Sequence, residues 1–228
     1  MALFLLAGLA IFAEPAFAHG GLANYTVGDT RYRGYDPSTP AEEQLGQPWM
    51  VQRPWSTIDP IFSVSSPYLA CNNPGTPPPP SYIPIRAGET LTAVYWYWLY
   101  AVGPLTVWLA RCEADCSEVN VNEVGWFKIW EAGWLEGGMA EGIWYQKAFQ
   151  KWDGSPALWP FCPECAHLNV TGEGETLPPR EFLVRFPGVY KEDDPSIKIN
   201  IYSEENANRT DYTILGGPIW DKFRLDDT

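Results

Sequence analysis

The residue best placed to do chemistry in this sequence is His19, because a predicted cleavage makes it the first residue of the mature chain. An apolar run from Leu3 to Phe12 precedes Ala-Phe-Ala at 16–18, and signal peptidase cuts after such small-x-small tripeptides. We therefore expect a signal peptide over residues 1–18 and a secreted protein. A terminal histidine can hold one metal ion through its amine and its imidazole, and copper(II) binds nitrogen ligands most tightly. The alternatives are cleavage at another bond and a His19 that is only an exposed first residue.

Composition limits the partners of the mature chain. The full chain carries a net charge of −13, and removal of residues 1–18 takes away one acidic residue, Glu14, which leaves −12. The length of residues 19–228 suits one large domain or two small ones, and the family resemblance described below implies a single domain. Such an acidic chain has no electrostatic attraction for nucleic acid or for an anionic membrane surface. The 12 Trp, 12 Tyr and 10 Phe suit either stacking on sugar rings or packing of a bulky core.

Five cysteines behind a signal peptide predict two disulfides and one remaining thiol. Cys112 and Cys116 stand four residues apart with no second Cys or His pair at zinc spacing, which favours a disulfide over a zinc site. Three Asn-x-Thr sequons, at Asn24, Asn169 and Asn208, fit a secreted glycoprotein, although such sequons also occur by chance.

Short extended runs separated by turn residues predict an all-β fold. Residues 23–27 alternate, and Gly28-Asp29 predicts a hairpin turn before residues 31–35. Residues 36–55 contain four prolines, so we expect a long surface loop there. Helical periodicity is never sustained, which favours an antiparallel β-sandwich with few short helices. Further strands are expected at 126–130, 182–186 and 197–202.

The segment from Leu91 to Ala110 contains 20 residues and no charge, enough to span a membrane. Gly103-Pro104 interrupts its second half, and Trp and Tyr are spread along it instead of gathered at its ends. Two buried strands joined by a Gly-Pro turn explain this composition better than a transmembrane helix.

Several short motifs follow one another in a fixed order over nearly the whole mature chain. Together they resemble the fungal lytic polysaccharide monooxygenases of auxiliary activity family 9, formerly glycoside hydrolase family 61. The motifs include His19-Gly20, Tyr32-x-Gly34-Tyr35-Asp36-Pro37, Arg53-Pro54-Trp55, Trp108-Leu109-Ala110-x-Cys112-x-x-x-Cys116, Phe186-Pro187-Gly188-Val189-Tyr190 and Tyr212-Thr213-Ile214.

This resemblance implies an immunoglobulin/fibronectin-like antiparallel β-sandwich with long surface loops and a flat face. On that face a copper ion is held by the amine and imidazole of the first residue, here His19, and by an internal histidine. The implied reaction is oxidative cleavage of cellulose or a related β-1,4-glucan at C1 or C4 by a monomer that takes electrons from an external donor. Tyr212 and Tyr32 would contact the substrate.

The resemblance also implies the disulfide pairing. Cys71 is expected to pair with Cys165, and Cys112 with Cys116. Cys162 is then the remaining thiol.

Three features depart from the pattern, two of them single positions. The internal brace histidine of the family falls on Ala101, and the axial tyrosine falls on Cys162. The one other histidine, His167, follows Cys165 closely on a predicted strand, where a core histidine is expected. Two function hypotheses therefore remain open: an oxidative enzyme, and an impaired relative that binds glycan or copper without oxidation.

The third departure is a shortening between Trp152 and Trp159, where the family has one more core strand and this sequence has only residues 153–158. A sandwich that loses a central strand exposes a sheet edge. Either a neighbouring loop covers that edge, or the sequence derives from a gene model that lacks an exon.

Overall fold

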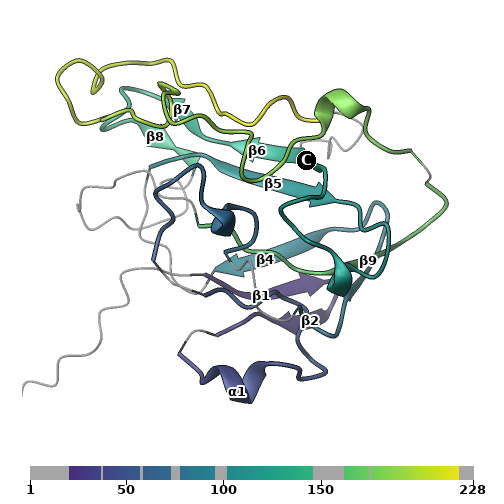
Figure 1. The fold of residues 1–228 in the computed structure, drawn as a ribbon. Helices are drawn as coiled ribbons and strands as arrows, with labels where there is room; N and C mark the ends of the chain where they lie inside the picture. The colour runs from purple at the N-terminus through teal and green to yellow at the C-terminus, as the bar shows by residue number, and fades with distance from the viewer. Residues whose placement is uncertain are drawn as a thin grey trace, which may run out of the picture.

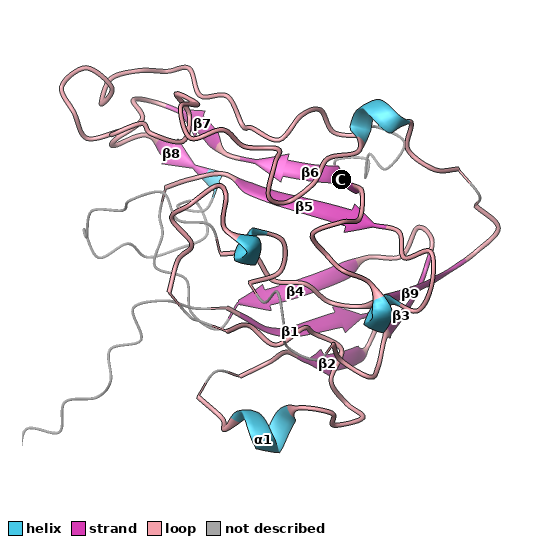
Figure 2. Ribbon diagram, in the orientation of Figure 1, coloured by secondary structure: helices cyan, strands magenta, loops and turns pink. Residues whose placement is uncertain are grey.

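The computed structural model describes residues 21–36, 38–56, 59–72, 78–95, 102–145, 162–174 and 176–220. Within these ranges nearly all regular structure is β-strand, with short helices between the strands (Figures 1 and 2). The strands are β1 (Leu22–Val27), β2 (Thr30–Arg33), β3 (Ile83–Arg86), β4 (Leu91–Tyr95), β5 (Leu105–Ala110), β6 (Trp126–Ala132), β7 (Trp134–Glu136), β8 (Ile143–Trp144) and β9 (Leu168–Thr171). The helices are α1 (Ala41–Gln44) and the 3-10 turns Pro67–Leu69, Cys116–Glu118 and Arg180–Phe182.

The strands form a three-stranded sheet in the order β2-β1-β4 and three two-stranded pairs, β3-β9, β5-β6 and β7-β8. The β5-β6 pair lies above the β2-β1-β4 sheet in the orientation of Figure 1. The all-β sandwich expected from the sequence is therefore confirmed. One described pair departs from the antiparallel pattern, because β3 and β9 run parallel.

The β1-β2 hairpin forms where the sequence predicts it. Gly28 occupies the turn with φ of +54°, a conformation that costs glycine little. The register of the β1-β4 ladder shifts between Leu22 and Asn24. Asn24 and Tyr25 are both buried, and because neighbours on a strand face opposite sides, both faces of β1 are covered at this point.

The core is divided among several apolar clusters. One packs against β5 and β6 and includes Leu69, Cys71 and Phe186. A second surrounds Trp144 on β8 and includes Ile199 and Ile201 from the later part of the chain. The remaining two pack around β1 and β3, and around Tyr35, Met50 and Trp55.

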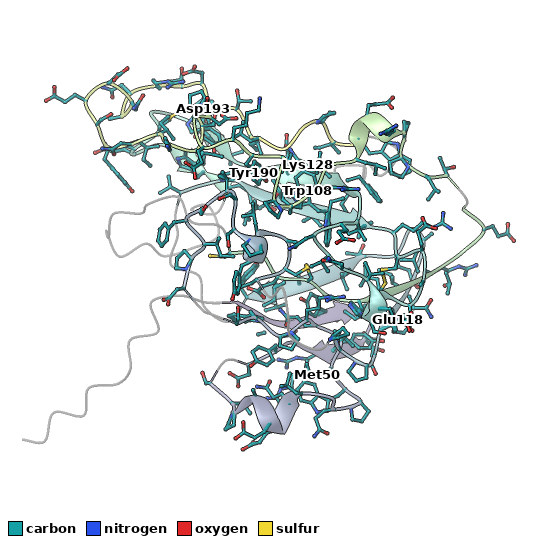
Figure 3. All side chains as sticks on the ribbon, in the orientation of Figure 1. Met50, Trp108, Glu118, Lys128, Tyr190 and Asp193 are labelled. Atoms are coloured by element: carbon teal, nitrogen blue, oxygen red, sulfur yellow. A yellow bond between two sulfur atoms is a disulfide. The ribbon has the colours of Figure 1, made fainter. Side chains whose placement is uncertain are left out.

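A buried lysine ties the C-terminal part of the chain to β6 (Figure 3). Lys128 has no exposed surface, and its Nζ donates to Glu131 Oε2 at 2.6 Å and to the carbonyls of Leu215 and Gly217 at 2.8 Å each. The same Nζ lies 5.2 Å from the centre of the Trp108 ring. Because a buried ammonium group needs such partners, these contacts hold the 215–217 backbone in place.

Both predicted disulfides are present. Cys71 pairs with Cys165 across a sequence separation of 94, and Cys112 pairs with Cys116 across a separation of four. Cys162 is free, as expected.

The interpretation of Leu91 to Ala110 as two buried strands is partly wrong. Strands β4 and β5 both form there, but β4 pairs with β1 and β5 pairs with β6. Four of the five residues of β4 are exposed, so β4 is not a core strand in this chain. None of the helices in the described ranges has the length and apolar character needed to cross a membrane.

Two other predicted strands are also wrong. Within 182–186 the backbone leaves a 3-10 turn and makes a single bridge between Val184 and Trp126. Residues 197–202 form turns, because the Asn200 side chain accepts from Tyr202 N at 3.1 Å and its carbonyl accepts from Ser203 N at 3.1 Å. Local hydrogen bonds of this kind compete with strand pairing.

The predicted surface loop at 36–55 is only partly on the surface. It includes α1, and it buries Met50, Val51 and Gln52 to 2% exposure or less. Met50 and Val51 contribute to two of the apolar clusters, and Gln52 is a buried polar residue.

The two disulfides predict different stability losses. The Cys71→Ala/Cys165→Ala double variant should lose about 4–5 kcal/mol of unfolding free energy, because this bridge closes a long loop. The matched Cys112→Ala/Cys116→Ala variant should lose about 2 kcal/mol, because its loop is short. Urea unfolding of both variants beside the parent measures the difference, and equal losses would contradict the loop-length argument.

Candidate functional site

The start of β1 is the candidate site, because it carries the chain from the predicted mature amino terminus into the fold. Leu22 N donates to Glu164 Oε2 at 2.7 Å, and Gln52 Nε2 donates to the same oxygen at 2.7 Å. Gln52 Oε1 in turn accepts from Tyr35 N at 2.7 Å. One carboxylate therefore joins β1 to the 36–55 segment and to the stretch that precedes β9.

Gly21 fits this site because it has no side chain. A Cβ at position 21 would collide with the Trp55 ring and would lie 2.9 Å from Glu164 Oε1. Trp55 is buried, and its ring meets that of Tyr35 edge-on at 6.1 Å. Trp55 thus supports the start of β1 from the interior of the protein.

Burial sets the protonation of the two ionisable groups beside this strand. It raises the pKa of Glu164 to about 7, although the hydrogen bonds from Leu22 and Gln52 oppose the shift. Burial, followed by the charge of Glu164, raises the pKa of Cys162 to about 12. The Cys162 thiol is therefore protonated at neutral pH and is a poor nucleophile.

His167 is buried, as predicted, and it lies directly before β9 instead of on a strand. Its side chain is 5% exposed, its Nε2 accepts from Arg53 Nε at 3.1 Å, and its ring lies 5.3 Å from that of Tyr82. Burial and the Arg53 charge lower the pKa of His167 to about 4, against a smaller opposing effect of Asp115. His167 is thus a neutral imidazole whose Nε2 is already engaged.

The donor set of this chain does not fit a three-nitrogen copper centre. His19 and Ala101 lie outside the described residues, but the sequence contains only two histidines, and His167 is committed to Arg53. Cys162 is a free cysteine and offers sulfur instead of a nitrogen donor. Among the residues that the structure describes, no group of three or more His, Cys, Asp or Glu side chains is placed to hold a metal ion.

The two tyrosines predicted to contact a substrate lie in different parts of the molecule. Tyr212 donates its hydroxyl to Ser196 O at 3.3 Å and packs edge-on against Trp144 at 5.1 Å. Tyr32 lies on β2 and packs against the cluster around β1. In Figure 1, β2 lies at the bottom of the view and the yellow C-terminal segment at the top.

The sequence analysis missed Glu164 and Gln52 as site residues. Glu164 is 142 residues from Leu22 and 112 from Gln52, so no local spacing connects them. The available signal was an acidic residue enclosed by Pro163 and Cys165 beside a predicted strand.

The three sequons differ in accessibility. Asn24 lies on β1 and is 7% exposed, whereas Asn169 and Asn208 are exposed. A glycan is bulky and hydrophilic, so only the last two positions accommodate one on the folded surface.

A family model described as auxiliary activity family 9, formerly GH61, matches residues 19–159 and 159–212. The chain is 34% identical over 248 aligned positions to an "AA9 family lytic polysaccharide monooxygenase-like protein CEL1" of Agaricus bisporus, covering 96% of this chain and 76% of that protein. It is 32% identical over 244 positions to "AA9 family lytic polysaccharide monooxygenase B" of Heterobasidion irregulare, covering 95% and 97%.

Solved structures show the same similarity. The crystal structure of HiLPMO9B superposes with a TM-score of 0.77 at 29% identity and covers 89% of this chain and 99% of that one. A cellulose-active polysaccharide monooxygenase from M. thermophila superposes with a TM-score of 0.75 at 27% identity, with the same coverage.

The raised pKa of Glu164 predicts a specific pH dependence of the unfolding free energy. Its folded-state pKa is raised, so its contribution to stability is present below its usual pKa near 4.5 and is lost as the pH rises through about 7. Glu164→Gln keeps an acceptor for both donors and removes the titration. The parent should therefore lose about 1–3 kcal/mol relative to this variant between pH 5 and pH 8.

Chemical denaturation across that pH range measures the effect. Glu43→Gln, at an exposed carboxyl on α1, is the matched control and should follow the parent. Parallel profiles for the parent and Glu164→Gln would contradict the pKa shift.

The exposure of the sequons predicts two glycans. In a glycosylating host, Asn169→Gln and Asn208→Gln should each lower the mass by one glycan, whereas Asn24→Gln should leave it unchanged. Intact-mass spectrometry before and after enzymatic deglycosylation measures this. A glycan found on Asn24 would contradict its burial in the folded chain.

Proposed function

The chain belongs to auxiliary activity family 9, and from this premise we propose that it is secreted and acts on cellulose or a related β-1,4-glucan. The reaction of the family is copper-dependent oxidative cleavage of polysaccharides. The observation that carries the proposal is a family match that extends over residues 19–212. The similarity to a structure described as cellulose-active supports the choice of substrate.

The position of the family match supports processing before His19. The match begins at residue 19, which is the residue that follows the predicted cleavage site. Cleavage there gives a terminal amine and an imidazole on one residue, and these two nitrogens are the proposed site for one copper ion. An oxidative reaction would also require an external electron donor, and we propose that the protein works as a monomer.

The described residues contribute to this site by positioning the chain. Glu164 and Trp55 hold Gly21 and Leu22, so the path of the backbone is set two residues after His19. The same contacts keep the start of β1 beside the segment that contains Cys162. A ligand residue gains affinity when its backbone is ordered before the ligand binds.

A second candidate function follows from the missing ligand. Ala101 stands at the position that the resemblance assigns to the second brace histidine, and His167 is engaged with Arg53. A chain with these residues would bind glycan, or copper at His19 alone, without oxidising the polysaccharide. Whether this protein is an enzyme therefore depends on one ligand position.

One experiment separates the two candidate functions. A chain that begins at His19 is loaded with copper(II), its electron paramagnetic resonance spectrum is recorded, and cellulose is incubated with the protein and a reductant. Oxidised oligosaccharides from this chain, and none from a control with one extra alanine before His19, would support the oxidative function, because the extra residue removes the histidine amine. Retention on cellulose without products would instead support the binding function, and neither retention nor products would contradict both.

Ala101→His tests the missing ligand directly. If the scaffold around position 101 still suits a brace, the added imidazole should tighten copper(II) binding at least about tenfold, as measured by competition with a chelator. Ala93→His, on the exposed strand β4, is the matched control and should leave the affinity unchanged. Equal affinities of Ala101→His and the parent would show that position 101 is not placed to complete the site.

A further inference from the structure

The Arg53 side chain holds one turn of the chain in place. This turn spans residues 112–119 and is closed by the disulfide between Cys112 and Cys116, and we call it the 112–119 turn. Arg53 Nη2 donates to Cys116 O at 2.7 Å and to Val119 O at 3.4 Å. The position of the turn therefore depends on where the Arg53 guanidinium lies.

The guanidinium is in turn positioned by His167. Arg53 Nε donates to His167 Nε2 at 3.1 Å. A guanidinium group has hydrogen-bond donors and no acceptor, so His167 Nε2 must offer a lone pair, which places the ring proton on Nδ1. Nδ1 is buried and makes no hydrogen bond. The contact between the two side chains therefore exists only while His167 is neutral.

A second proton on His167 would bind to Nε2, since Nδ1 already carries one. Nε2 would then present an N–H to the N–H of Arg53, and the facing nitrogens of two cations would lie 3.1 Å apart. Both side chains are buried, with His167 at 5% and Arg53 at 8% exposure, so solvent screens this repulsion poorly. A charged His167 is thus incompatible with the present position of Arg53.

Tyr82 holds the same turn from another side. Its hydroxyl donates to Asp115 Oδ1 and accepts from Cys116 N at 3.0 Å, and its ring lies 5.3 Å from that of His167. Asp115 Oδ1 also accepts from Ser117 N at 2.8 Å. Hydrogen bonds from Ser117 and Tyr82 lower the pKa of Asp115 to about 2, so this carboxylate is ionised at pH 4 and above.

His167 is the group of this cluster that can change charge between pH 4 and pH 7. The charged and titratable groups that act on it are Arg53, Tyr82 and Asp115. Arg53 stays cationic and Asp115 anionic over this range, and Tyr82 stays neutral because its pKa lies above the usual value of 10. Burial, followed by the Arg53 charge, lowers the pKa of His167 to about 4.

We propose that the 112–119 turn is a latch that acid releases: protonation of His167 expels the Arg53 guanidinium, and the turn loses its hydrogen bonds to Arg53. In the released state the imidazole regains its usual pKa near 6.5. Release therefore becomes easier as the pH falls below about 6.5 and approaches its limit near pH 4. The latch requires neither copper nor glycan, so it is independent of the proposed function.

Hydrogen exchange of the purified chain tests the latch. The amides of Cys116 and Ser117 are hydrogen-bonded within the turn and report whether it is in place. Their protection factors should fall at least about tenfold from pH 7 to pH 4, while those of β6 stay constant. In His167→Gln the fall should be absent, because glutamine offers Arg53 an acceptor that takes up no proton.

Tyr82→Phe is the matched control. It removes two hydrogen bonds of the turn at every pH, so protection of the Cys116 and Ser117 amides should be lower at both pH values, with the same ratio between them as in the parent. An equal fall in the parent and in His167→Gln would overturn the proposal. A parent whose β6 amides lose protection to the same extent would overturn it as well, because the whole chain would then be unfolding.

A measurement on the parent alone decides the matter where His167→Gln does not fold. In an NMR titration, the His167 ring should take up its proton over the pH range in which the 112–119 turn loses protection. A ring that is still neutral after the turn has lost its protection would contradict the latch, and so would a turn that stays protected when the ring is charged.

Discussion

The geometry of the amino-terminal region depends on the Glu164 carboxylate. Its Oε2 accepts hydrogen bonds from the Leu22 backbone and the Gln52 side chain, each 2.7 Å long. A hydrogen bond contributes about 0.5–1.5 kcal/mol to a neutral carboxyl group and about 1.5–3 kcal/mol to an ionised one, and the loss of one partner costs a comparable energy. The next residue, Cys165, is held to Cys71 by the long-range disulfide. A covalent bond therefore anchors the acceptor, and the acceptor anchors the strand that follows the mature amino terminus.

Local patterns predicted the parts of the fold that local physics determines. The Gly28 turn, the β6 strand and the closely spaced Cys112–Cys116 disulfide each depend on residues near one another in sequence. The strand prediction for residues 197–202 was wrong because an alternating apolar pattern only indicates that a segment fits a pleated surface. There, Asn200 satisfies neighbouring backbone groups itself, and Ile199 and Ile201 reach the core from turns.

The candidate site was predictable only at its first residue. His19 follows from the signal-peptide pattern, which is local. The roles of Glu164, Gln52 and Trp55 arise from contacts that join distant parts of the chain, and no periodicity records them. The burial of Trp55 against Gly21 also shows why an aromatic-rich composition could not decide between a sugar-binding surface and a core.

The fold and the ligand set of this protein are determined by different residues. A superposition over most of the chain depends on many apolar contacts, such as those around Phe186 and Trp144, and these tolerate sequence change while the total packing is kept. A metal centre depends on a few donors, and one alanine in place of histidine removes a nitrogen that no amount of packing replaces. The imidazole of His167 does not substitute for that nitrogen. Its Nε2 accepts a hydrogen bond from Arg53 Nε, and the ring is buried. Movement of that ring toward the amino terminus would remove one hydrogen-bond partner from the buried Arg53 guanidinium. The free-energy cost of removing a partner from a buried charge is larger than that of rearranging a surface side chain. Family membership therefore describes the scaffold of this chain, and in our proposal the residue at position 101 decides its chemistry.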